Sequence, residues 1–216
     1  MEEIVSSIPK IGDKAPDFQA VSSQGTITLK QFRGKWVILF SHPADFTPVC
    51  TTEFIEFAKR MPEFEKRNAQ LIGLSIDSVY SHIAWALQIE KLTGVEIKFP
   101  IIADLSMEVS KLYGLIHEKS STTSTVRAVF FIDPDGIVRA LIYYPASTGR
   151  NIDEILRVLD SLTYVDSFMI ATPANWKPGE DVIVPSPSTV DKAKERMKDN
   201  SLKVMDWFLA MKKVQK

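Results

Sequence analysis

The chain has 216 residues, of which 45% are hydrophobic and 25% are charged, and its formal net charge at pH 7 is −1. These values are ordinary for a globular protein with one large domain, or one domain with an appendage. The near-zero charge gives no support to binding of nucleic acid or of a membrane surface, and no stretch approaches the roughly 18 apolar residues of a membrane-spanning helix.

Cysteine occurs once, at position 50. One cysteine cannot form a disulfide within the chain, which favours a reducing compartment. The first residues, Met-Glu-Glu-Ile-Val, lack the basic and apolar regions of a secretory signal. We therefore expect a cytoplasmic protein.

The first third of the chain predicts strands followed by a helix. Residues 18–21 and 26–29 should form a hairpin. The apolar run Trp36–Phe40 is typical of a buried strand, and a polar turn follows it. Thr47 suits the N-cap of a helix, and Pro48 suits its first position, where the missing N–H costs nothing.

Strands and helices then alternate along the chain. We expect a strand at 71–76, a helix at 80–93 ended by Gly94, a strand at 99–103 and a short helix at 106–113.

Two strands, at 126–132 and 137–144, flank the turn sequence Asp133-Pro-Asp-Gly136, and Asn151 should cap a helix from Ile152 to about Leu162. This order predicts an α/β protein with the architecture of a thioredoxin-like sandwich, preceded by the N-terminal hairpin.

The composition changes after about residue 170, where four prolines interrupt the chain. We place the domain boundary between residues 1–168 and a C-terminal arm of residues 169–216. Within the arm we expect a charged helix at 188–198 and a second helix at 202–211. Trp176, Trp207 and Phe208 are too apolar for a solvated tail, so they either pack back on the domain or bury against another subunit.

The lone cysteine needs two interpretations side by side. A single cysteine is usually a small buried hydrophobe without chemistry. The count from Thr47, however, places Cys50 at the third helical position, beside unpaired N–H groups and the positive end of the helix dipole. A lowered pKa and raised reactivity are expected there. Pro43, Thr47 and Cys50 also share a strand-to-helix junction, where α/β folds place ligands.

The pattern Pro43-x-x-x-Thr47-x-x-Cys50 resembles the active-site signature of the peroxiredoxins, and the run from His42 to Cys50 is similar to their one-cysteine subgroup. Further matching segments occur in the expected order along almost the whole chain: Gly12–Phe18, Phe32–Trp36, Arg127 in Thr125-Val-Arg-Ala-Val, and Gly179–Pro185.

The resemblance implies a thiol-dependent peroxidase without a cofactor or metal. Its Cys50 would reduce hydrogen peroxide and organic hydroperoxides to water and alcohols and become a sulfenic acid. With no second cysteine, an external thiol, either thioredoxin-like or small, would recycle it. The resemblance also favours the arm as a dimerisation element, and it allows a decameric ring of dimers.

Lowering the pKa of Cys50 cannot by itself make this reaction fast. A drop from about 8.5 to about 6 raises the thiolate fraction roughly 30-fold, but the weaker nucleophilicity returns roughly tenfold. Positioning and polarisation of the O–O bond must therefore dominate.

Several groups could position and polarise a peroxide. The Thr47 hydroxyl and the backbone N–H groups of Val49 and Cys50 could bind its oxygen atoms, although Thr47 could also be a plain N-cap. Arg127 lies in an apolar strand, where its charge needs a partner; a salt bridge and a catalytic cation are both open from the sequence, and the resemblance favours catalysis. Pro43 would shape the turn and shield the thiol.

Three secondary candidates are less specific. His42 could hydrogen-bond the thiol or be satisfied by backbone. Glu53, three residues after Cys50, could orient Arg127 or lie in solvent. Arg150 precedes a helix, an unfavourable place for a cation, which indicates an anionic partner such as the Cys50 pocket. His82 and Trp85 are assigned to packing alone.

Other functions fit the sequence less well. A thioredoxin-type oxidoreductase would need Cys-x-x-Cys, whereas this chain has Thr47-Pro-Val-Cys50. A cysteine hydrolase would need a histidine base in characteristic surroundings, and the three histidines show no zinc-ligand spacing. A non-catalytic holdase-like assembly remains an alternative from a different class.

Overall fold

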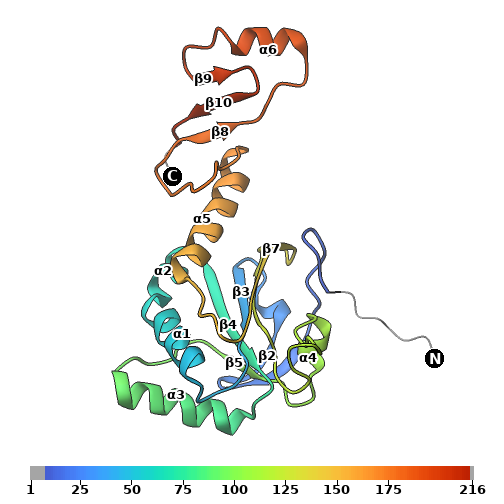
Figure 1. Ribbon diagram of the computed structural model, residues 1–216, viewed down its shortest axis with the longest axis vertical. Helices are drawn as coiled ribbons and strands as arrows, with labels where there is room; N and C mark the ends of the chain where they lie inside the picture. Colours follow the sequence, from blue (N-terminus) through green and yellow to red (C-terminus); the bar gives the residue numbers. More distant parts are fainter. Residues whose placement is uncertain (1–7, 215–216) are drawn as a thin grey trace, which may run out of the picture. The chain divides into compact units, whose positions relative to one another are not determined.

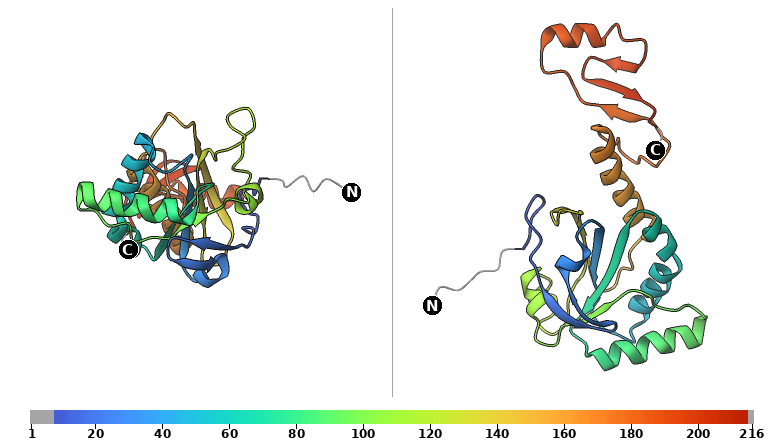
Figure 2. Two further views of the ribbon diagram at one scale, coloured as in Figure 1. Left: turned by 90° about the horizontal axis from the view of Figure 1, so that it is seen from below. Right: turned by 180° about the vertical axis from the view of Figure 1, so that it is seen from behind.

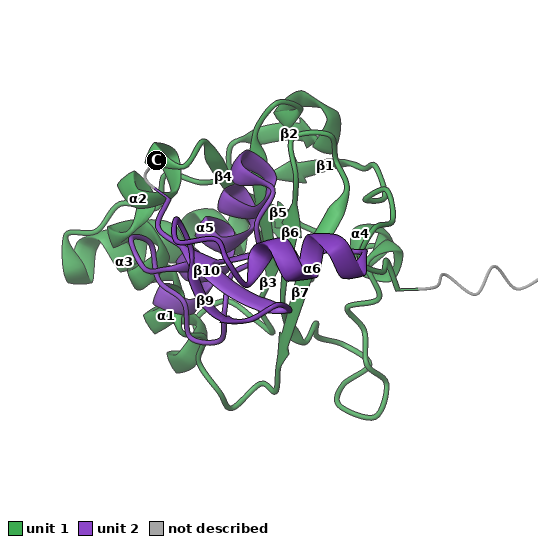
Figure 3. Ribbon diagram, turned by 90° about the horizontal axis from the view of Figure 1, so that it is seen from above, with its two compact units in different colours: residues 1–152 green, residues 153–216 purple. Residues whose placement is uncertain are grey.

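The computed structural model describes residues 8–214. The chain divides into two compact units, residues 1–152 and 153–216 (Figure 3). This division falls at the start of a long helix, whereas the expected boundary after residue 168 falls at its end. Among the described helices, none has the length and apolar character needed to cross a membrane.

The first unit is built on a seven-stranded mixed sheet with the order β2-β1-β5-β4-β3-β6-β7 (Figure 1). Strands β3, β4 and β5 are parallel, and the remaining pairs are antiparallel. The expected hairpins at 18–29 and 126–144 are confirmed. The strands are β1 (Gln19–Ser22), β2 (Gly25–Thr28), β3 (Trp36–Ser41), β4 (Ala69–Ser75), β5 (Ile101–Ala103), β6 (Arg127–Ile132) and β7 (Val138–Tyr144).

Helices cover both faces of this sheet, with α1 and α2 on one side and α4 on the other (Figures 1 and 2). The expected end signal holds for α3, where Gly94 ends the helix at φ 71°, and at the start of this helix the Ser78 hydroxyl accepts the N–H of Ser81. The elements are a 3-10 helix η1 (Leu29–Phe32) and α1 (Pro48–Lys59), α2 (Met61–Lys66), α3 (Val79–Thr93) and α4 (Glu108–Leu112).

Strand β3 is buried along its whole length because it lies between β4 and β6 and is covered on both faces. Val37 and Leu39 belong to a core cluster that also contains Tyr113. Phe40 stacks on Phe57 of α1 at a centroid distance of 4.2 Å. The strand therefore fixes where its C-terminal end delivers the chain to α1.

The second unit contains a small antiparallel sheet of order β8-β10-β9. The helix expected at 202–211 is wrong, because this segment is the β9–β10 hairpin with the alternating burial of a strand pair. The charged helix at 188–198 is confirmed as the shorter α6. The elements are α5 (Ile152–Phe168), β8 (Val182–Val184), α6 (Val190–Arg196), β9 (Lys203–Asp206) and β10 (Leu209–Lys212).

A separate apolar cluster of Tyr164, Ile170, Trp176 and Val182 holds the second unit together. Helix α5 runs past the expected end near Leu162 because Tyr164 contributes to this cluster. Trp176 is fully buried within this cluster, so it packs inside its own chain and offers no surface to another subunit.

Candidate active site

The candidate site lies where β3 passes into α1 through residues 42–47, here called the Cys50 loop. Thr47 is the N-cap residue of α1 with an extended backbone, and Cys50 is the third helical residue. Phe46 adopts a left-handed conformation with φ 56°, which turns the chain sharply before the helix and is strained for an aromatic residue. Pro43 and Val49 are half-buried, and Cys50 is fully buried.

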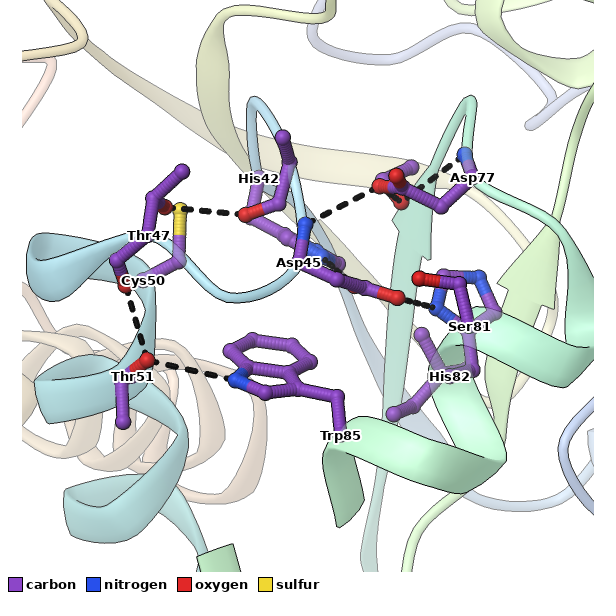
Figure 4. Close-up of polar contacts among 12 residues, drawn as sticks. His42, Asp45, Thr47, Cys50, Thr51, Asp77, Ser81, His82 and Trp85 are labelled. Atoms are coloured by element: carbon purple, nitrogen blue, oxygen red, sulfur yellow. Dashed lines mark hydrogen bonds and ion pairs between the residues drawn. The ribbon is translucent and has the colours of Figure 1, made fainter. Parts of the chain in front are cut away.

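The Thr47 hydroxyl does not cap the helix with its side chain. It donates instead to the carbonyl oxygen of Ala44 at 2.9 Å, within the Cys50 loop. The Thr47 carbonyl accepts the Thr51 hydroxyl at 2.8 Å, and that hydroxyl accepts the indole N–H of Trp85 at 3.2 Å (Figure 4). Loop and first helical turn are thus fixed together, and Trp85 does more than pack.

Arg127, the first residue of β6, points its guanidinium at the cysteine. Its Nη1 lies 3.2 Å from Cys50 Sγ and 2.7 Å from Glu53 Oε2. Its Nε and Nη2 both donate to the carbonyl oxygen of Ala146, at 3.0 and 2.8 Å. The guanidinium group of Arg127 is therefore held rigidly, and its Nη1 donates to the sulfur and to Glu53.

Glu53 lies on the same face of α1 as Cys50 because the two are three residues apart. Its carboxylate also binds Arg150, through Arg150 Nε at 2.9 Å, Nη2 at 2.6 Å and the backbone N–H at 2.8 Å. The anionic partner expected for Arg150 is Glu53, not the thiol pocket itself. The expected role of Glu53 in orienting Arg127 agrees with this geometry.

Glu53, Arg127 and Arg150, here called the arginine cluster, carry an unbalanced charge. All three side chains are at most 2% exposed. An arginine stays protonated inside proteins, so two guanidinium groups face one carboxylate and leave one positive charge over. The thiolate of Cys50 would neutralise that charge at a distance of 3.2 Å.

His42 lies apart from this charge network. Its Nε2 contacts Asp45 Oδ1 at 2.8 Å, and among the described residues its Nδ1 has no hydrogen-bond partner, so no bond to Cys50 is present. The ring packs against both Phe54 and Trp85, which also contact each other. Full burial lowers its pKa, against the opposing effect of Asp45.

Asp45 and His82 are the residues that the sequence analysis missed. His82 Nδ1 contacts Asp45 Oδ2 at 2.8 Å, so packing alone does not describe His82 (Figure 4). Among residues 8–214, His42, Asp45 and His82 form the only group of possible metal ligands close enough together, with donor atoms within 4.8 Å of one another. The contacts from both rings to Asp45 are hydrogen bonds, which account for the arrangement without a metal. The sequence signal that could have indicated this cluster is the spacing His42-x-x-Asp45 inside the motif.

The comparisons with known families agree with this geometry. Residues 11–141 match the AhpC/TSA family, and residues 161–200 match the C-terminal domain of 1-Cys peroxiredoxin. A peroxiredoxin of Methanosarcina mazei is 54% identical over 215 residues, covering 95% of this chain and 98% of the relative. One of Thermoplasma volcanium is 57% identical, covering 92% and 96%.

Solved structures give the same result for the fold. A yeast mitochondrial 1-Cys peroxiredoxin superposes with a TM-score of 0.86 at 40% identity, covering 96% of this chain and all of its own. A cysteine-to-serine mutant of the peroxiredoxin 6 of Arenicola marina gives 0.85 at 35% identity, covering 96% and 99%. The thioredoxin-like α/β fold is therefore confirmed, and its C-terminal subdomain contains a sheet. The chain belongs to the peroxiredoxin family, as a thiol-dependent peroxidase with a single cysteine.

Proposed function

We propose that Cys50, Thr47 and Arg127 carry the peroxidase reaction, with hydrogen peroxide and organic hydroperoxides as substrates. The Cys50 thiolate attacks the terminal oxygen of the hydroperoxide. The S–O bond forms as the O–O bond breaks, and the leaving oxygen takes a proton to become water or an alcohol. The sulfur is left as a sulfenic acid, oxidised by two electrons.

The observation that carries this proposal is the 3.2 Å contact from Arg127 Nη1 to Cys50 Sγ, inside a buried cluster with one positive charge in excess. Such a cluster favours the anionic sulfur before the reaction. It also favours the charge that develops on the leaving oxygen, because Arg127 is held in place before the substrate arrives.

Thr47 and the start of α1 would hold the two peroxide oxygens. The Thr47 hydroxyl donates its hydrogen to the carbonyl oxygen of Ala44, so the lone pairs of the hydroxyl oxygen can accept a hydrogen bond from the substrate. The N–H groups of Val49 and Cys50 belong to the helix start, where no preceding turn supplies acceptors, and can donate to oxygen. Pro43, at the loop entrance, restricts water.

An external thiol would return the sulfenic acid to the thiol, because the chain contains no second cysteine. The structure of the yeast relative is described as the basis of a thiol-resolving mechanism via glutathione/thioredoxin systems. We extend that chemistry to this chain, with a thioredoxin-like protein or a small thiol as donor. Such donors are kept reduced in the cytoplasm, which we propose as its location.

The second unit would form a homodimer, and a ring of five dimers is a further assembly that the resemblance allows. Trp207 and Phe208 are 45% and 51% exposed at the β9–β10 hairpin. Two neighbouring aromatic side chains with this exposure offer an apolar contact of the kind found at the core of subunit interfaces.

The test is a peroxide-consumption assay with dithiothreitol, glutathione and thioredoxin as parallel thiol donors, followed by mass spectrometry of the peroxide-treated protein. We expect turnover with at least one donor and added oxygen on Cys50. The variant Cys50→Ser should lose turnover with all three. Full turnover by Cys50→Ser would reject Cys50 as the reacting group.

A further inference from the structure

His42, Asp45 and His82, here called the histidine cluster, form a second buried set of titratable groups beside the Cys50 loop. The exposed fractions of the three residues are 0%, 7% and 0%. His42 and Asp45 belong to the loop, and His82 comes from α3 (Figure 4). The proposed peroxidase reaction assigns no task to Asp45 or His82.

The hydrogen bonds of His82 fix where its protons are. Its Nε2 lies 3.1 Å from the carbonyl oxygen of Ile102, which has no hydrogen, so Nε2 must donate. Its Nδ1 lies 2.8 Å from Asp45 Oδ2, so one hydrogen lies between that nitrogen and the carboxylate oxygen. The charge of His82 depends on which of the two atoms holds it.

Asp45 is a carboxylate in this setting. Burial alone would raise its pKa, but the hydrogen bonds from His42 and His82 outweigh burial and hold the pKa well below its usual range. A carboxyl group is ordinarily the stronger acid, with a pKa of about 3.9 against about 6.5 for an imidazolium, so the hydrogen between Asp45 Oδ2 and His82 Nδ1 belongs to His82, which then carries a proton on both ring nitrogens.

His42 is neutral by the same reasoning. Its Nε2 donates to the ionised Asp45 at 2.8 Å. A second proton on Nδ1 would create a buried donor without an acceptor among the described residues, because Nδ1 has no partner there. Burial lowers the pKa of His42 and the charge on His82 lowers it further, while Asp45 and Asp77 act in the opposite direction.

We infer that His82 is an imidazolium ion paired with Asp45, and that this buried pair positions the Cys50 loop while it keeps His42 neutral. Asp45 and His82 are then positioning residues for the peroxidase reaction. The inference rests on the proposed roles of Cys50 and Thr47, because the loop matters only if those groups react.

The His82–Asp45 pair is connected to Thr47 in two ways, through the Cys50 loop that contains Asp45 and through helix α3 that contains His82. The Asp45 backbone N–H donates to Asp77 Oδ2 at 3.0 Å, and the Asp45 side chain ties the loop to α3 through His82. Helix α3 also carries Trp85, which reaches the Thr47 carbonyl through the Thr51 hydroxyl. A loss of the His82–Asp45 contact would loosen the loop that places Thr47 and Cys50.

The direct test is nitrogen NMR of the histidine rings in the reduced wild-type protein labelled with ¹⁵N-histidine. The chain has three histidines, and the variant His117→Gln identifies the exposed one. At pH 7 we expect both nitrogens of His82 protonated, and His42 protonated on Nε2 only. A bare Nδ1 on His82 would overturn the inference. So would a spectrum that changes when EDTA is added, because a metal ion would then occupy the place of the protons.

The variant His82→Gln keeps a donor for Asp45 but removes the charge. The uncompensated carboxylate should then draw a proton to Nδ1 of His42, and the reaction of Cys50 with hydrogen peroxide should slow by about 10- to 100-fold, as small misplacements of reacting groups do. The double variant Asp45→Asn/His82→Gln removes both charges and should return His42 to its neutral form. His117→Gln should match the wild type in rate.

Each outcome separates charge from bulk packing. A slow His82→Gln variant with an unchanged His42 spectrum would overturn the charge assignment, since lost packing alone would explain the rate. An unchanged rate would overturn the positioning role. If the wild type itself fails to react with peroxide, the proposed function fails, whereas the ring spectrum still decides the protonation of His82.

Discussion

Replacing Arg127 by methionine tests the electrostatic part of the proposal most directly. Methionine keeps much of the apolar stem of arginine and removes its charge. Glu53 would keep its bonds to Arg150, so the arginine cluster would become neutral, and a thiolate at Cys50 would then add an unbalanced negative charge.

The magnitude follows from the 3.2 Å contact between Arg127 Nη1 and Cys50 Sγ. At that distance, Coulomb's law with an effective dielectric constant of about 20 gives about 5 kcal/mol of attraction. Hydrogen bonds to charged groups retain about 1.5–3 kcal/mol after the cost of dehydration, so the thiolate population should fall by about 10- to 100-fold. The rate of peroxide reaction should fall further, because the leaving oxygen loses the same cation.

The assay is thiolate absorbance as a function of pH, together with stopped-flow oxidation of Cys50. Arg139→Met is the matched control, since Arg139 lies in β7 of the same sheet and pairs with Asp133. An Arg127→Met protein with a wild-type thiolate population would refute the charge argument. A lowered thiolate population with an unchanged rate at saturating pH would refute polarisation of the O–O bond.

Three further predictions concern stability and assembly. Glu53→Gln should cost about 3–5 kcal/mol of unfolding free energy, because two buried guanidinium groups lose their counter-charge, whereas the exposed Glu56→Gln should leave Tm within about 2 °C in calorimetry. Burial lowers the pKa of His42 in the folded protein, so below about pH 6.5 the unfolded chain binds a proton that the folded chain does not. The free energy of unfolding should therefore decrease as the pH is lowered below that value, by up to about 1.4 kcal/mol per pH unit. The variant His42→Gln should remove this pH dependence in denaturant titrations. Replacing Trp207 and Phe208 by serine should shift sedimentation from dimer to monomer, and an unchanged mass would exclude this hairpin from the interface.

Most of the fold could be predicted because its signals are local. Apolar runs such as Trp36–Phe40 identified the buried strands, and Asp133-Pro-Asp-Gly136 identified the β6–β7 hairpin, in which Gly136 adopts φ 77°. The segment 202–211 was misassigned because a short apolar stretch fits helix and strand equally well. Its pairing with β8 depends on contacts that a local pattern does not contain.

Local spacing predicts only the part of the site that lies in one short segment, whereas Arg127, 77 positions from Cys50, is assigned to the site by the peroxiredoxin resemblance. Cys50 and Thr47 follow from the helix start, and Glu53 follows from its spacing to Cys50. The bond between Glu53 and Arg150 joins residues 97 positions apart, so no spacing rule could supply it. The dipole argument did indicate an anionic partner for Arg150, but local reasoning could not choose between two anions in one pocket.

The two buried networks beside Cys50 differ in net charge, and this difference separates their effects. The arginine cluster carries one positive charge in excess and contacts the sulfur directly, so changes there should alter how much thiolate exists. The histidine cluster, with one imidazolium and one carboxylate, is neutral as a whole, and it acts on Cys50 through the Cys50 loop and through the contact of Trp85 in α3 with Thr51. Substitutions that preserve its neutrality should therefore leave the thiolate population unchanged and act on the rate alone. A family member can thus keep its thiolate population and still react slowly if the pair that holds its loop is lost.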